Sequence, residues 1–100
     1  MPIQPGTINA DYKAPGGKLL RVAMQIATGA DGVSTIQTLR ITGDFFIHPE
    51  EAIEDLERRL TGAPLDEAEL RARAQAFFSG DVQVVGARAE DVVHALLKAA

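Results

Sequence analysis

The run YKAPGGKLLRV at residues 12–22 places two lysines on either side of two glycines. Pro15 and Gly16 suit the central positions of a tight turn, because proline restricts φ and glycine accepts a positive φ. The ammonium groups of Lys13 and Lys18 and the glycine N–H groups would then gather at one corner of the molecule. Such a corner would attract an anion or the acidic surface of a partner.

A phosphate-binding loop of the Walker type is a weaker interpretation of the same residues. Its spacing is G-x-x-x-x-G-K-[ST], and here Leu19 occupies the position of the Mg²⁺-binding hydroxyl. The run also precedes an expected strand rather than a helix, so no helix dipole would face the phosphate. The sequence therefore favours a hairpin turn over residues 15–18.

Other side chains do not combine into a catalytic or metal site. His48 and His94 are the only imidazoles, and neither has a second ligand at the spacing of a zinc site. Ser34 and Ser79 lack the G-x-S-x-G context of a serine nucleophile. The chain has no cysteine, so thiolate ligands, disulfides and thiol nucleophiles are excluded. The sequence thus predicts no catalytic residue and no metal ligand, and it points to a binding or accessory role.

The charged residues are unevenly distributed along an otherwise ordinary globular composition. The 100 residues are 46% hydrophobic and carry a net charge of −4, which argues against nucleic-acid binding. Bases outnumber acids up to Gly43, whereas the stretch that follows is acidic. Glu50, Glu51 and Glu54 lie in that stretch, where a solvated helix face is a better interpretation than a paired-carboxylate site.

The length of the chain predicts a single domain over residues 1–100, with residues 1–7 as a flexible segment. No apolar run approaches the roughly 20 residues that cross a bilayer, and no signal-peptide pattern is visible. We therefore expect a cytoplasmic protein that does not bind a membrane.

Residues 8–42 are predicted to form three antiparallel strands. From Leu20 to Met24, apolar residues alternate with other residues, which is typical of a strand with one buried face. Ile36 is out of phase with the apolar residues that follow it. A β-bulge near Gln37 would restore a common face, because one extra residue reverses the alternation.

Residues 49–99 are predicted to be mainly helical. Pro49 suits the first position of one helix, Asp66 is a typical N-cap of the next, and Arg88 stands as a poor N-cap before the last. A short apolar strand or extended linker is expected over residues 82–85. The predicted fold class is therefore α+β, with a three-stranded antiparallel sheet in the N-terminal half packed against about three helices.

Two adjacent phenylalanines, Phe45 and Phe46, stand between the predicted sheet and the first helix. Successive residues of an extended chain point to opposite faces. We therefore expect one ring to enter the core and the other to face solvent or a partner.

Two motifs in this chain resemble the C-terminal accessory domain of lipoate–protein ligases, in particular the stand-alone small subunit of two-piece ligases. The first is K-x-P-G-G-K-L at residues 13–19, and the second is G-D-F-F at residues 43–46. The order of predicted elements over residues 12–98 also fits that family.

The resemblance implies a fold similar to that of the iron–sulfur scaffold and sulfur-acceptor proteins. It also implies an accessory subunit that is not catalytic alone and binds no cofactor alone. With a separate catalytic large subunit, it would support the ATP-dependent activation of lipoate to lipoyl-AMP. ATP, Mg²⁺ and lipoate would belong to the complex, and the lysines of lipoyl domains would receive the lipoyl group afterwards.

By the same resemblance, the residues of both motifs would face the catalytic subunit or the adenylate site. The two lysines would neutralise phosphate charge, since a cation beside a developing anion stabilises it. The residues that would face the partner or the adenylate are Lys13, Pro15, Gly16, Gly17, Lys18, Gly43, Asp44, Phe45 and Phe46.

Two alternatives share this fold class. One is a non-catalytic interaction module without a role in a ligase, which would use Phe45 or Phe46 and the sheet. The other is a sulfur-transfer protein or iron–sulfur scaffold. That chemistry needs a thiolate, and the absence of cysteine disfavours it.

Overall fold

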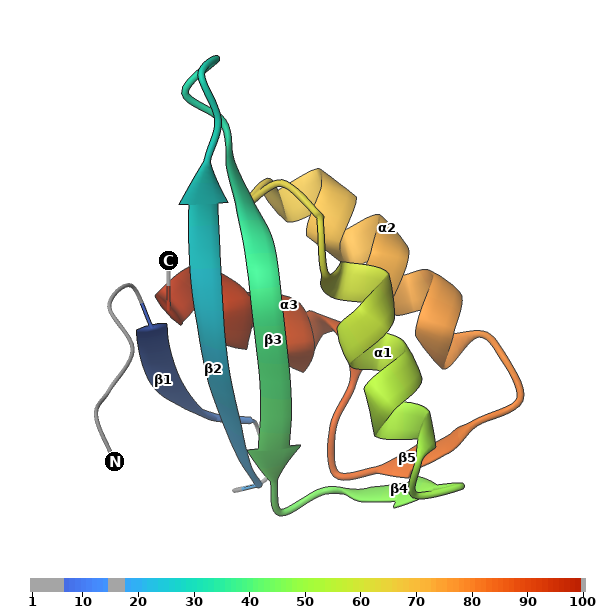
Figure 1. Cartoon of the computed structure of the whole chain (residues 1–100). Helices are drawn as coiled ribbons and strands as arrows, with labels where there is room; N and C mark the ends of the chain where they lie inside the picture. The colour runs from blue at the N-terminus through green and yellow to red at the C-terminus, as the bar shows by residue number, and fades with distance from the viewer. Residues whose placement is uncertain (1–6, 15–17, 100) are drawn as a thin grey trace.

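The structure, a computed structural model, describes residues 7–14 and 18–99. Three strands, β1 (Thr7–Lys13), β2 (Leu19–Thr28) and β3 (Ser34–Gly43), form an antiparallel sheet in the order β1-β2-β3 (Figure 1). The predicted strands of the N-terminal half are confirmed. The flexibility expected at the N-terminus concerns mostly residues 1–6, outside the described part, and Thr7 already belongs to β1.

The β-bulge expected at Gln37 is confirmed. The register of β2 and β3 shifts between Gln25 and Ile26, and the pairing passes over Gln37. The offset from Ile36 to Ile41 is odd, which would place the two side chains on opposite faces of a regular strand. Because of the bulge, both are buried on the same face. The extra residue thus keeps the apolar side chains of β3 on the face that the helices cover.

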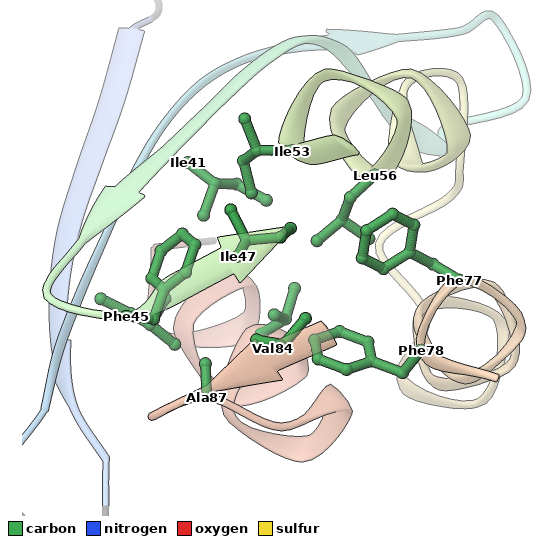
Figure 2. A pocket seen from close by; sticks show the side chains of 11 residues that line it. Ile41, Phe45, Ile47, Ile53, Leu56, Phe77, Phe78, Val84 and Ala87 are labelled. Atoms are coloured by element: carbon green, nitrogen blue, oxygen red, sulfur yellow. The ribbon is translucent and has the colours of Figure 1, made fainter. Parts of the chain in front are cut away.

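Two short strands, β4 (Phe46–His48) and β5 (Gln83–Val85), form a second antiparallel sheet, the β4–β5 ribbon. The strand expected near residues 82–85 is present, and its partner is a segment that the sequence pattern did not identify as a strand. Phe45, Ile47 and Val84 point from this region into the core (Figure 2). Phe46 is exposed, so the prediction that the two phenylalanine rings diverge is confirmed.

Three helices, α1 (Ala52–Leu60), α2 (Glu67–Phe78) and α3 (Ala89–Ala99), cover one face of the larger sheet (Figure 1). Helix α3 packs against β1 and β2, α1 packs against β3, and α2 packs on both other helices. This arrangement confirms the predicted α+β class. No helix among the described residues is long and apolar enough to span a membrane.

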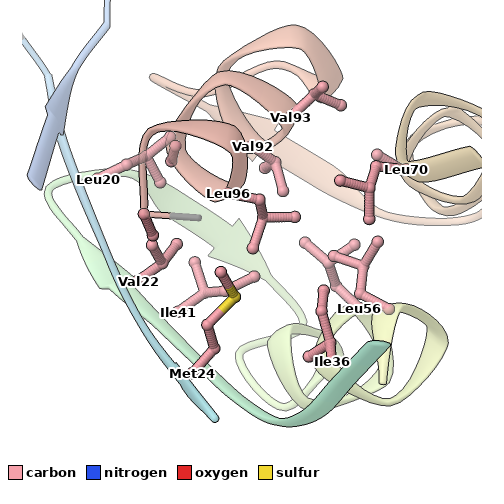
Figure 3. Close-up of a cluster of buried hydrophobic side chains, with 14 of the residues drawn as sticks. Leu20, Val22, Met24, Ile36, Ile41, Leu56, Leu70, Val92, Val93 and Leu96 are labelled. Carbon is pink, nitrogen blue, oxygen red and sulfur yellow. The ribbon is translucent and has the colours of Figure 1, made fainter. Parts of the chain in front are cut away.

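The hydrophobic core lies between the larger sheet and the three helices (Figure 3). Every one of these elements except the edge strand β1 contributes fully buried side chains to it. The largest of these fully buried side chains are Leu20, Val22, Met24, Ile36, Leu56, Leu60, Leu70, Val92, Val93 and Leu96.

The starts of α1 and α2 differ in how well the sequence predicts them. Helix α1 begins at Ala52 rather than at Pro49, which corrects the prediction. The Ala52 N–H donates to the Pro49 carbonyl at 3.0 Å, a three-residue turn that precedes the α-helical hydrogen bonds. Helix α2 begins as predicted, because the Asp66 carboxylate accepts a hydrogen bond from the Glu69 N–H at 3.0 Å.

Candidate partner-binding site

Four segments meet at one end of the molecule, which we call the ribbon end. They are residues 13–14, residues 18–19, residues 43–48 and residues 83–88 (Figure 1). The Ala14 N–H donates to the Lys18 carbonyl at 2.7 Å, and the Asp44 N–H donates to the Leu19 carbonyl at 2.9 Å. These bonds tie the start of β2 to both neighbouring segments.

The ribbon end brings together most of the residues singled out by the two sequence motifs. These are Lys13, Lys18, Gly43, Asp44, Phe45 and Phe46. Both lysines are exposed, as are Asp44 and Phe46. Pro15, Gly16 and Gly17 belong to the first motif but lie outside the described residues.

Gly43 allows β3 to end directly against the start of β2. A Cβ atom at this position would collide with the Leu19 carbonyl oxygen and would lie 3.1 Å from the Leu20 Cα. Backbone atoms cannot move aside cheaply, so the close approach requires glycine. It is this approach that lets Asp44 bond to Leu19, and Gly43 therefore shapes the site through the backbone.

Gly86 is a residue of the site that sequence reasoning missed. Its φ is +96°, and a Cβ there would lie 3.2 Å from the Lys18 Cγ and 3.4 Å from the Phe45 Cα. The aliphatic part of Lys18 therefore passes close to the loop between β5 and α3. A glycine between an apolar strand and an expected helix was the signal that could have indicated a special turn here.

An open hollow of about 460 Å³ lies beside this loop. Lys18 and Arg88 both line it, so the structure adds to the site a cation that the sequence indicated only as a poor N-cap. The residues that line the hollow are Lys18, Val84, Val85, Gly86, Ala87, Arg88 and Asp91.

Asp91 compensates for the weak N-cap at Arg88. Its carboxylate is only 3% exposed and accepts a hydrogen bond from the Arg88 N–H at 2.9 Å. This is the reverse half of a capping box, in which a side chain in the first turn bonds back to the N-cap backbone. The acid three residues after Arg88 was the sequence signal, and it fixes the loop that carries Arg88.

A second, much smaller cavity lies behind the β4–β5 ribbon (Figure 2). Its volume of about 10 Å³ is close to the least space that holds one water molecule. Phe45, Ile47 and Val84 line it together with side chains from the larger sheet and all three helices. The cavity is a small packing gap, and an acyl chain does not fit into it.

The remaining candidate residues lie away from this site or are exposed. His48 is exposed on β4. On α3, the Nδ1 atom of His94 lies 3.2 Å from the Tyr12 hydroxyl oxygen, at hydrogen-bond distance. Over residues 7–14 and 18–99, no three His, Asp or Glu side chains come close enough to hold a metal ion. The acids Glu50, Glu51 and Glu54 are exposed, as predicted.

Ion pairs shift several pKa values on the helices. The Arg71 guanidinium donates to both carboxylate oxygens of Glu90, at 2.8 and 3.0 Å, and these bonds lower the pKa of Glu90. The same bonds, with a further one to Glu67, raise the pKa of Arg71. On α1, a hydrogen bond from Arg59 lowers the pKa of Asp55. The first of these pairs joins α2 to α3 and so supports the helix that follows Arg88.

Comparison with known proteins gives one consistent result. No protein-family model matches the chain. The chain is 33% identical over 86 residues to lipoate-protein ligase A subunit 2 of Thermoplasma acidophilum, a match that covers 86% of this chain and 83% of the relative. It is also similar to a chain in the solved structure of an archaeal lipoylation system from that organism, a bi-partite lipoate protein ligase and its E2 lipoyl domain. That match has a TM-score of 0.75 at 28% identity and covers 90% of this chain and 93% of the other. Both similarities extend over most of each molecule.

Proposed function

The chain belongs to the family of lipoate-protein ligase A subunit 2, and from this we propose that it supports the ATP-dependent activation of lipoate to lipoyl-AMP by a separate catalytic subunit. The relative and the structural neighbour are parts of a ligase divided between two chains. In the proposed scheme the lipoyl group passes in a second step to the lysines of lipoyl domains.

One observation carries this proposal. The described residues gather motif side chains and cations at one exposed end, and the cavity of about 10 Å³ behind the ribbon has no room for lipoate. In the proposed scheme the catalytic subunit holds the acyl group. In that scheme ATP and its Mg²⁺ bind to the complex rather than to this chain alone.

We assign the ribbon end to the catalytic subunit and the adenylate. Lys13 and Lys18 are exposed and are free to place ammonium groups beside phosphate oxygens, where a charge-assisted hydrogen bond is strongest. Pro15, Gly16 and Gly17 would face the same partner. Gly43, Asp44, Phe45 and Phe46 would shape the adjoining surface.

The test measures lipoyl-AMP formation from lipoate and ATP, with the catalytic subunit alone and after addition of this chain. We expect the product only after mixing, and we expect Lys18→Ala to lower the rate by about ten- to a hundredfold, because a charge-assisted bond contributes about 1.5–3 kcal/mol. Circular dichroism and the urea midpoint should not change, since the side chain is exposed.

Arg58→Ala is the matched control. It removes an exposed cation in the last turn of α1, and we expect a wild-type rate. If the catalytic subunit forms lipoyl-AMP equally well without this chain, the proposed function is wrong, and an interaction module without a role in activation becomes the better interpretation.

A further inference from the structure

We propose that the outer face of the β4–β5 ribbon is the anchor by which this chain docks on the catalytic subunit, with Phe46 and Val85 entering an apolar pocket of that subunit. This inference rests on the proposed function and names the contact that would carry most of the affinity. Val85 was not among the residues that the sequence motifs indicated.

Phe46 and Val85 form a single apolar patch in the described structure. They are direct cross-strand partners, so their side chains stand side by side on one face of the ribbon. Phe46 is 58% exposed and Val85 is 63% exposed. Among the described residues, the only other large hydrophobic side chain left exposed is Val33, at the far end of the molecule.

The ribbon is held firmly enough to act as an anchor. An isolated two-stranded sheet is only marginally stable, but the next cross-strand pair, Ile47 and Val84, faces inward (Figure 2). Both of these side chains pack against the hydrophobic core. Phe46 and Val85 are therefore presented on a platform whose other face is fixed.

Cations border the apolar patch. Val85 and Gly86 line the same hollow as Lys18 and Arg88, and the Lys18 stem passes beside Gly86. An apolar centre that contains an aromatic ring and is bordered by arginine is typical of the residues that dominate binding energy at protein interfaces. The patch and the cations thus form one continuous surface.

Charge indicates which partner fits this surface. At the ribbon end, Lys13, Lys18 and Arg88 outnumber the exposed Asp44. A second copy of this chain would place the same cations opposite one another, which disfavours symmetric self-association. The surface instead fits a different chain whose apolar pocket is bordered by carboxylates, and within a two-piece ligase that chain is the catalytic subunit.

The test compares two exposed valines at opposite ends of the molecule. Val85→Ser should raise the Kd for the catalytic subunit at least tenfold, measured by isothermal titration calorimetry. Val33→Ser, in the connection between β2 and β3, should leave the Kd within twofold of the wild type. Both variants should keep the wild-type urea midpoint, and Phe46→Ser is the second variant if Val85→Ser does not fold.

A rate measurement separates docking from chemistry. At high concentration Val85→Ser should restore the wild-type rate of lipoyl-AMP formation, because a docking residue affects occupancy of the complex rather than the reaction within it. A rate that stays low at saturation would overturn the anchor role, as would a wild-type Kd for both ribbon variants. A wild-type dimer in sedimentation experiments that dissociates on Val85→Ser would assign the surface to a second copy instead.

The two proposals fail in different ways. If wild-type chain and catalytic subunit form no lipoyl-AMP together, the proposed function is wrong whatever the variants do. If they form it and both ribbon variants, Val85→Ser and Phe46→Ser, bind as tightly as the wild type, only the anchor is wrong.

Discussion

Asp91 shows how a single buried side chain can organise the loop that carries the candidate site. Its carboxylate lies almost completely out of solvent and accepts the Arg88 N–H at 2.9 Å. The same loop holds Gly86, against which the Lys18 stem lies. One hydrogen bond at the start of α3 thus helps to fix the loop that carries Arg88 and Gly86.

We predict that Asp91→Ala lowers the free energy of unfolding by about 1–2 kcal/mol, because it removes a helix cap and leaves a backbone donor without its partner. Urea denaturation measures the change. Glu50→Ala, which removes an exposed acid ahead of α1, should stay within about 0.5 kcal/mol of the wild type. Equal stability of the two variants would mean that the Asp91 hydrogen bond contributes nothing to the fold.

At the scale of elements, the ion pair between Arg71 and Glu90 fixes α3 against α2. Arg71 lowers the pKa of Glu90 below the ordinary value of 4.5, so the ionised carboxylate favours the folded state. The stabilisation is complete above the pKa of the unfolded chain and is lost as the pH falls through the lower pKa of the folded chain.

Glu90→Gln should therefore have a lower urea midpoint than the wild type at pH 7, and the gap should close as the pH falls below 4.5. The measurement is a series of urea titrations from pH 7 to pH 3. Glu54→Gln, an exposed change on α1, should follow the wild type throughout. A gap that stays constant down to pH 3 would show that Glu90 acts through packing rather than charge.

The elements that sequence predicted well are those whose pattern is local and repeated. The alternation around Val22 predicts β2, and counting positions from Ile36 predicts the bulge at Gln37. Asp66 marks the start of α2 because its cap depends on residues within one helical turn. In each case the information lies within a few residues of the element.

The parts that sequence missed depend on contacts between distant segments. Strand β4 has three residues, too few to show a period, and it is a strand because it pairs with β5. The approach of Lys18 to Gly86 likewise joins the start of the sheet to the loop before α3. Proximity of this kind cannot be predicted from spacing along the chain.

At the scale of the whole molecule, the two ends of the larger sheet are built differently. The connection between β2 and β3 extends beyond the helices, whereas the opposite end is covered by the β4–β5 ribbon (Figure 1). The hydrophobic core reaches the ribbon through Phe45, Ile47 and Val84. A partner that docks on the ribbon would therefore contact a part of the molecule that unfolds together with the core.

This continuity leads to a prediction about hydrogen exchange. A partner that binds only the folded chain, at a free concentration of 100 times its Kd, stabilises the fold by about 2.7 kcal/mol. That free energy corresponds to about a hundredfold slower exchange for amides that open only by global unfolding. Such amides are expected on the central strand β2, at the buried residues Val22 and Met24.

The experiment measures exchange of these amides with and without the catalytic subunit. Exchange of these amides should slow about a hundredfold in the wild type and in Val33→Ser. In Val85→Ser, whose Kd is tenfold weaker at the same partner concentration, exchange should slow only about tenfold. Slowing confined to the β4–β5 ribbon, with β2 unchanged, would contradict the prediction. It would mean that the ribbon opens independently of the core, in which case docking on the ribbon could not stabilise the whole chain.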